Sequence, residues 1–245
     1  MTASAALSDR KPVPLATETM TWRVHGEVRR LLWRGRTAFD LTAVDTAALS
    51  SEPFDEPTAE AIANADALVM LYELGDDAAQ SREAFRLLTA EAMAACGARL
   101  VRSRLPHPLA VITLDFDRLD VLRHAIDGRW LNQAPTGRRL PCILDRDALG
   151  LLRSLSASTE FDVPKLVQQK FVDDRVSYHA SSARGFPLIA NENFDPVRLL
   201  GVSSPADQGD WQPPLPINVL EPIIRIHRAA QRSSRTARLT RGRRP

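Results

Sequence analysis

The stretch LAVITLDFD, residues 109–117, is the strongest indication of fold class in this 245-residue chain. Its first five residues, Leu109 to Thr113, are apolar or β-branched without a break, which is the pattern of a strand buried on both faces. A second apolar run, ALVMLYEL at 67–74, precedes it, and the residues between the two runs, 76–104, have the apolar spacing of a long helix. Strand, helix and strand in this order predict parallel neighbours in an α/β sheet.

The flanking segments extend this plan. The sequence predicts a hairpin formed by 21–33 and 36–45, a helix at 57–65, a last strand at 197–203 and a closing helix at 218–232. Gly97 is expected to interrupt the long helix, since glycine has a low helix propensity. We therefore expect a three-layer, mainly parallel α/β sheet with an antiparallel edge hairpin.

The domain boundaries follow changes of composition. Residues 1–18 are small, polar and proline-bearing, so we expect a disordered leader, followed by a single α/β domain at 19–232. Within this domain, residues at about 127–190 combine helical spacing with Pro and Gly breaks, and we expect a helical insertion there. Residues 233–245 are expected to be a basic, disordered tail.

Composition places the chain among proteins of a reducing compartment. Its two cysteines, Cys96 and Cys142, lie far apart and form no C-x-x-C pair, so no disulfide framework is expected. The sequence contains no apolar run long enough to span a bilayer and no signal-peptide core near Met1, which favours a cytoplasmic protein. The abundance of arginine and alanine over lysine fits a bacterial origin.

The C-terminus is strongly basic although the whole chain has a formal net charge of only +2. No acidic residue follows Glu221. The arginines of the tail are Arg232, Arg235, Arg238, Arg241, Arg243 and Arg244. These arginines could neutralise the phosphates of nucleic acid, which is therefore a candidate partner. The alternative is a solvated tail. No aromatic residue lies between the arginines to stack on bases.

Two groups of polar residues are candidate sites with simpler alternatives. Ser181, Ser182, His179 and the Asp173-Asp174 pair lie close together, but no G-x-S-x-G elbow frames either serine, and a polar surface loop is the expectation. The histidines and cysteines show no metal-ligand spacing, so no metal site is expected.

A third group is formed by Asp115, Asp117 and Asp120, which follow the strand at 109–113. A cation or base site at the carboxyl end of that strand is one interpretation. Capping of the following helix by Asp117 is the other.

In its order of elements the chain resembles the second half of the Ras-like, or TRAFAC-type, P-loop GTPase domain. The motifs that carry the resemblance are the hairpin ending in Asp45-Thr46-Ala47-Ala48, the strands DALVMLYEL, LAVIT with LDFD, and LLGVSS, and the closing N-V-L-E-P before a helix. The last motif is similar to the bacterial GTPase-like domains of conflict or signalling systems. The resemblance covers roughly 21–125 and 195–228.

The resemblance implies a vestigial nucleotide site. Asp45 corresponds to the D-x-x-G aspartate that holds a water on Mg²⁺, and Ala48 stands where glycine gives its N–H to the γ-phosphate. Asp117 corresponds to the last residue of the N-K-x-D box, which accepts hydrogen bonds from guanine, while Leu114 and Asp115 replace the Asn and Lys. Ser203 falls loosely in the S-A-K loop.

The phosphate half of such a site has no counterpart in the sequence. A P-loop requires G-x-x-x-x-G-K-[ST], but no Gly-Lys pair occurs, and the residues before Thr21 leave no room for a strand, loop and helix. Phosphoryl transfer in this family depends on that lysine and on Mg²⁺, so we expect no GTP hydrolysis by this chain alone and no bound cofactor.

The expected function is that of a non-catalytic, GTPase-like protein-interaction module in a bacterial multi-component system, whose partner is a protein such as a complete GTPase. Two alternatives stay open. One is a GTPase subunit that uses GTP and Mg²⁺ with a P-loop supplied by a partner chain or by sequence upstream of Met1. The other is a basic, nucleic-acid-associated factor.

Overall fold

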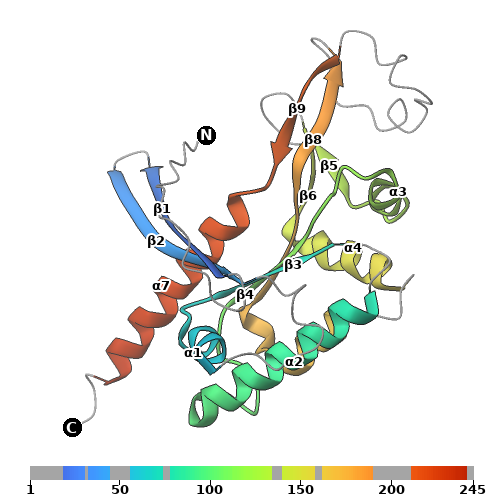
Figure 1. Ribbon diagram of the computed structural model, residues 1–245. Helices are drawn as coiled ribbons and strands as arrows, with labels where there is room; N and C mark the ends of the chain where they lie inside the picture. Colours follow the sequence, from blue (N-terminus) through green and yellow to red (C-terminus); the bar gives the residue numbers. More distant parts are fainter. Residues whose placement is uncertain are drawn as a thin grey trace.

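The computed structural model describes residues 19–30, 33–44, 56–73, 78–133, 140–157, 162–189 and 211–241 (Figure 1). These residues form a mixed α/β structure, which confirms the predicted class. In the first half of the chain the elements are β1 (Thr19–Arg30), β2 (Trp33–Val44), α1 (Glu56–Asn64), β3 (Leu68–Tyr72), α2 (Ala78–Cys96), η2 (Gly97–Arg99) and β4 (Leu109–Thr113). The second half contains α3 (Leu119–Asp127), β5 (Leu131–Gln133), β6 (Pro141–Ile143), α4 (Asp145–Ala157), α5 (Val163–Lys170), η3 (Asp173–Arg175), β7 (Val176–Ala180), β8 (Ser182–Ile189), β9 (Trp211–Ile217) and α7 (Glu221–Arg241).

The central sheet has the order β3-β4-β7, and both pairs are parallel. Its middle strand, β4, is buried at all five positions, as the continuous apolar run predicts. Parallel strands in one sheet require crossover connections, and these are supplied by α2 between β3 and β4 and by the helices between β4 and β7.

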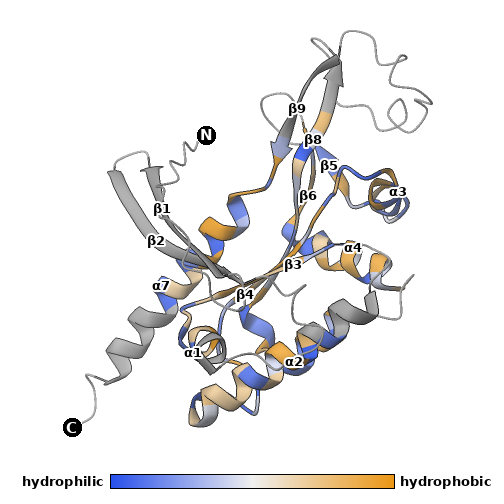
Figure 2. Cartoon of the chain, in the orientation of Figure 1, coloured by the Kyte–Doolittle hydropathy of each residue, from blue (hydrophilic) through white to orange (hydrophobic). Residues whose placement is uncertain are grey.

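Helices pack on both faces of this sheet. Leu109 and Val111 of β4 face a core formed with α1, α2, α4 and α5, in which Phe85, Leu152 and Val163 are buried. Side chains alternate along a strand, so Ala110 and Ile112 face the other side, where α7 packs on β4 and buries Ile226 and Ala230. Figure 2 shows β4 apolar over most of its length, whereas α2 and α4 mix apolar and polar residues.

A second core lies beyond the carboxyl end of the sheet. It joins α3, α4, β6 and the β8–β9 hairpin through buried residues that include Phe116, Leu122, Leu151, Phe186 and Ile217. Trp130 packs against this core and lies close to two glycines. A Cβ atom added at Gly150 would lie 2.9 Å from Trp130 Cε2, so the indole fits only because α4 has no side chain there.

The N-terminal hairpin forms as predicted, with β1 and β2 antiparallel along their full length. Residues 34–35, which the sequence predicts to separate the two strands, lie within β2, because β1 ends at Arg30 and β2 begins at Trp33. The prediction of an edge hairpin is met only in part, because β1 and β2 form a separate two-stranded sheet and are not hydrogen-bonded to β3-β4-β7 among the described residues. Gly97 ends α2 with a φ of 51°, as expected for a residue that breaks the helix.

The predicted helical insertion at 127–190 is mixed in structure. It contains α4 and α5, but it also contributes β7, the third strand of the central sheet, and all of β8. The error has a physical cause. The strand VSYHA alternates apolar residues with Ser177 and His179, which contact each other, so its sequence lacks the continuous apolar run that marks β3 and β4.

Two further boundaries differ or lie outside the described residues. The closing helix α7 begins at Glu221 and continues to Arg241, so most of the segment predicted to be a disordered tail is helical. Residues 1–18 and the predicted strand at 197–203 lie outside the described residues.

Candidate functional site

The carboxyl ends of β3, β4 and β7 meet at one edge of the sheet and are joined by backbone hydrogen bonds. Leu114 N–H donates to Tyr72 O (2.8 Å), Ser181 N–H to Thr113 O (2.9 Å) and Phe116 N–H to Ser181 O (3.0 Å). The segment after β4 is therefore held beside the segment after β7. This is the edge at which open α/β sheets place ligands.

Asp115 turns the chain at this edge. Its φ of 51° lies in the left-handed region, which Asp adopts more readily than most residues. The turn directs Phe116 into the second core, where it is fully buried and meets Phe186 edge to face with ring centroids 5.3 Å apart. Asp117 is left half-buried at the edge of the sheet.

The edge cluster consists of Asp117, Ser182 and Gly185. Ser182 Oγ donates a short hydrogen bond to Asp117 Oδ1 and accepts one from Gly185 N–H (2.6 Å). Gly185 has a φ of 75°, which glycine adopts without steric cost and which lets the chain turn back toward Ser182. Since Ser182 is only 1% exposed, its hydroxyl is fully used in fixing the carboxylate.

The capping interpretation of Asp117 is wrong. The N-cap of α3 is Arg118, and no side chain caps it. Asp120, the third carboxylate of the group, instead forms an exposed ion pair with Arg118 (2.7 Å), and this hydrogen bond lowers the pKa of Asp120. Of the three carboxylates, Asp117 is therefore the one in the edge cluster.

The other predicted site residues, Asp45, Ala48 and Ser203, lie outside the described residues. The prediction of a polar surface loop around His179 is wrong for most of that segment, because His179, Ser181 and Ser182 are all buried. Sequence reasoning therefore missed Ser182 as the partner of Asp117. The alternation of Val176, Tyr178 and Ala180 with polar residues was the signal for a strand that delivers it there.

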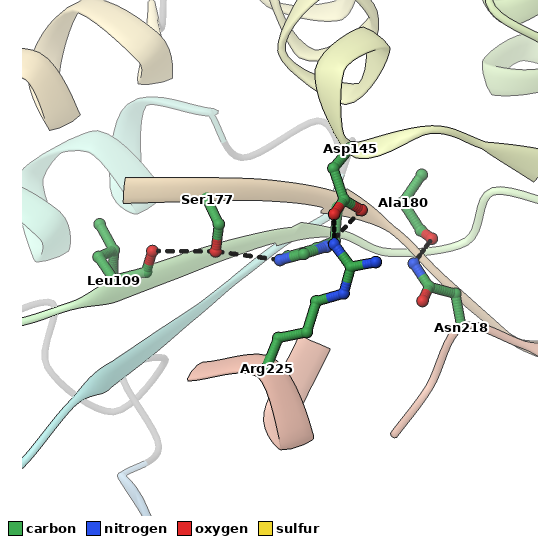
Figure 3. A network of polar contacts seen from close by, with 7 residues as sticks. Leu109, Asp145, Ser177, Ala180, Asn218 and Arg225 are labelled. Carbon is green, nitrogen blue, oxygen red and sulfur yellow. Dashed lines mark hydrogen bonds and ion pairs between the residues drawn. The ribbon is translucent and has the colours of Figure 1, made fainter. Parts of the chain in front are cut away.

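A second polar group, the His179 network, lies on β7 and joins three elements (Figure 3). His179 Nε2 is 3.0 Å from Ser177 Oγ, and His179 Nδ1 is 3.2 Å from Asp145 Oδ1. Asp145 is the first residue of α4, and its Oδ2 forms an ion pair with Arg225 of α7. Ser177 also lies within 3.4 Å of Leu109 O.

Burial sets the protonation of this network. His179 is 2% exposed, and desolvation lowers its pKa, so the ring is neutral at pH 7. A neutral imidazole has one donor and one acceptor, and the carboxylate of Asp145 requires the donor at Nδ1. Nε2 is then an acceptor, and Ser177 Oγ–H is the donor that faces it.

Two cavities border the His179 network. One, of about 400 Å³, is lined by Ser177, Tyr178, Asp145, Arg146 and Leu149 among others. The other, of about 560 Å³, lies between β6 and the start of α7 and includes Cys142, Asn218 and Arg225. The start of α7 is held to the sheet because Asn218 Nδ2 donates to Ala180 O (2.9 Å).

Metal ligands and membrane-spanning helices are two further features that the described part of the chain could contain. There, no three His, Cys, Asp or Glu side chains are grouped so as to hold a metal ion. Within the same residues, every helix is too short or too polar to cross a bilayer.

Comparison with protein family models, with curated proteins and with solved structures finds no match for this chain. Any statement about its function therefore rests on its own residues. The edge cluster and the His179 network are the two arrangements in the described residues that carry such an argument.

Proposed function

We propose that this chain is a GTPase-like interaction module that does not hydrolyse GTP by itself and that retains the base-recognition edge of a nucleotide site. The observation that carries the proposal is the hydrogen bond between Asp117 and Ser182, which follow the neighbouring parallel strands β4 and β7. The Ras-like resemblance requires its guanine-reading aspartate and its S-A-K serine at this edge.

The contact of Asp117 supports a different serine for the S-A-K loop. Ser182-Ala183-Arg184 follows the end of β7 after one intervening residue, and its serine contacts Asp117, while Ser203 lies 21 residues later in the sequence. Arg184 keeps the positive charge of the lysine. We therefore assign Ser182 in place of Ser203 to this part of the proposed site.

The chemistry of Asp117 favours guanine over adenine. An ionised carboxylate only accepts hydrogen bonds, and guanine presents two donors side by side, N1–H and the N2 amino group. Ser182 occupies Oδ1 and fixes the rotation of the carboxylate, so Asp117 is pre-oriented for a planar base. The absence of any Gly-Lys pair in the sequence supports the lack of hydrolysis, because phosphate charge is left without its usual partner.

Base recognition is tested by exchanging the hydrogen-bonding pattern of residue 117. Isothermal titration with guanosine, xanthosine and adenosine is expected to show a preference for guanosine in the wild type. Asp117→Asn adds an amide donor, so its preference should move to xanthosine, whose C2 position carries an acceptor. Asp120→Asn, which changes an exposed carboxylate on the same segment, should behave as wild type. Equal binding of all three nucleosides, or none at millimolar concentration, contradicts the proposed base site.

The absence of hydrolysis has its own test. Purified protein with GTP and Mg²⁺ should release phosphate no faster than buffer. GTP turnover that is lost in Asp117→Ala would contradict a module without GTPase activity and would favour a GTPase with an unrecognised phosphate site.

A second candidate function, binding of nucleic acid, is favoured by the extent of α7. The helix continues to Arg241 and carries Arg232, Arg235, Arg238 and Arg241 without an acidic residue after Glu221. Neutralised phosphates make such binding steeply salt-dependent. A chain ending at Arg232 should bind double-stranded DNA more weakly than the full chain and with a smaller slope against log salt; equal slopes exclude this function.

A further inference from the structure

We propose that Ser177, His179 and Asp145 form a nucleophilic site that hydrolyses small carboxylic esters from the 400 Å³ cavity beside β7. The inference is independent of the proposed base site, which lies beyond the carboxyl ends of β4 and β7. It rests on the order of the three side chains, on the accessibility of the serine and on a backbone donor next to it.

The nucleophile and its base lie on one face of β7. Ser177 and His179 are two residues apart on a strand, so their side chains point the same way. The distance of 3.0 Å from Ser177 Oγ to His179 Nε2 is within the range for a serine and its general base. Ser177 is half-buried and lines the cavity, whereas His179 is fully buried behind it.

Asp145 acts as a positioning residue. Its carboxylate accepts from His179 Nδ1 (3.2 Å), which selects the tautomer with a free lone pair on Nε2. The ion pair between Arg225 and the second oxygen of Asp145 fixes the carboxylate in turn, as Figure 3 shows. Leu109 O is a competing acceptor for the Ser177 proton, but it lies 3.4 Å away, further than His179 Nε2.

The pairing of β7 with β4 determines which backbone N–H can donate to the oxyanion that forms when the serine attacks the ester. Ser181 N–H bonds to Thr113 O of β4, so Ser181, His179 and Ser177 direct their backbone groups toward β4. The alternate residue Tyr178 then directs its N–H to the other edge of β7, which pairs with no strand among the described residues, and Tyr178 also lines the cavity. The N–H that follows the nucleophile is a recurrent oxyanion donor in serine hydrolases.

The reaction balances with an ester and water alone. Ser177 Oγ attacks the carbonyl carbon while its proton passes to His179 Nε2. The bond from the carbonyl carbon to the leaving oxygen breaks, and the alcohol takes the proton from His179. Water then attacks the acyl-serine with His179 as base, which releases the carboxylic acid and restores Ser177. The cavity volume suits an ester of short chain.

The chain contains a matched control. Ser154 Oγ is 2.9 Å from His124 Nδ1, a second serine and histidine pair, but no carboxylate is hydrogen-bonded to that imidazole in the described residues. Ser154→Ala therefore removes a half-buried serine with a histidine partner and leaves the proposed site intact.

The experiment uses the full chain, a fluorophosphonate probe read by intact mass and peptide mapping, and hydrolysis of p-nitrophenyl acetate. The wild type is expected to carry one adduct, on Ser177, with adduct and hydrolysis both lost in Ser177→Ala and kept in Ser154→Ala. His179→Gln should slow labelling by about 10²-fold or more. Asp145→Asn should lower kcat with little change in KM, which a purely structural role does not predict.

The contrary outcomes are equally defined. No adduct on wild type that melts cooperatively, an adduct on another residue, or labelling that survives in Ser177→Ala overturns the proposal. Each variant is first shown to keep the far-UV circular dichroism of the wild type. Because Asp117 takes no part in this assay, failure here leaves the nucleoside titrations as a separate result.

Discussion

The edge cluster and the His179 network are two arrangements of serine with polar partners on neighbouring parts of one sheet, and they use the serine hydroxyl differently. Ser182 accepts from a backbone N–H, donates to a carboxylate and is shielded from solvent. Ser177 donates toward an imidazole and lines a cavity. A fully satisfied, buried hydroxyl therefore orients its neighbour, whereas a half-buried hydroxyl facing a base has the geometry of a nucleophile.

The two groups also differ in what supports them. The edge cluster depends on the second core, since Phe116 anchors the residue next to Asp117. The His179 network depends on contacts between elements, because Asp145, His179 and Arg225 come from α4, β7 and α7. Mutations in the core and at the contacts should therefore affect the two groups unequally.

The largest effect is expected for Phe116→Ala. Phe116 is 0% exposed, and removing a buried phenyl ring costs about 3–5 kcal/mol in the free energy of unfolding. Urea denaturation followed by fluorescence measures the loss. If it is below about 1 kcal/mol, the second core does not support the edge cluster as described.

The next effect should come from Asp145→Ala, which leaves His179 Nδ1 buried without its acceptor. Loss of a hydrogen bond from a buried group to a carboxylate costs about 1.5–3 kcal/mol. Arg225→Ala removes only the partner on the exposed side, since the Arg225 side chain is 58% exposed, and should cost less than about 1 kcal/mol. If the two variants lose equal unfolding free energy, the contribution of Asp145 comes from its ion pair with Arg225 and not from its hydrogen bond with His179.

Ser182→Ala is expected to cost about 1–2 kcal/mol, because Gly185 N–H loses its acceptor in a buried position. Ser181→Ala is the matched control. Ser181 Oγ only donates, to Ile217 O at 3.3 Å, so its removal leaves a carbonyl rather than an N–H unpaired. Urea titrations of both variants measure the loss of unfolding free energy. If Ser181→Ala loses as much as Ser182→Ala, or more, the special role of Ser182 is contradicted.

The edge cluster could be predicted from the sequence only in part. LAVIT and ALVMLYEL predict β4 and β3 because burial on both faces leaves an unbroken apolar run. Asp117 was placed correctly at the carboxyl end of β4. Its partner Ser182 was not placed in a strand, because VSYHASS is polar enough to be read as a loop. Only the structure shows that His179 and Ser182 are buried in contacts.

The His179 network was beyond sequence reasoning for a further reason. Asp145 and His179 are 34 residues apart, and only the packing of α4 on β7 brings them together. No local pattern reports such a contact. The Ser177-x-His179 spacing is the one local signal, and it is uninformative until that segment is known to be a strand.

The smallest predicted effect is a pH dependence of stability, which is expected from the His179 network and not from the edge cluster. Burial lowers the pKa of His179, so below about pH 6.5 the unfolded chain binds more protons than the folded one, and stability falls as pH falls. From pH 7 to 6, a histidine that stays neutral in the folded chain contributes a loss of at most about 0.7 kcal/mol, because the unfolded chain then binds about half a proton more. The pKa values of His107 and His227 are also lowered by burial, so His179→Asn should remove only a share of the slope.

Thermal melts at pH 7 and 6 on wild type, His179→Asn and Ser182→Ala measure this share. Ser182→Ala should lower stability at both pH values and keep the wild-type difference between them, because it changes no histidine. His179→Asn should reduce that difference. If His179→Asn keeps the full difference, the imidazole is not held neutral by its burial, and Nε2 is not the acceptor that Ser177 faces.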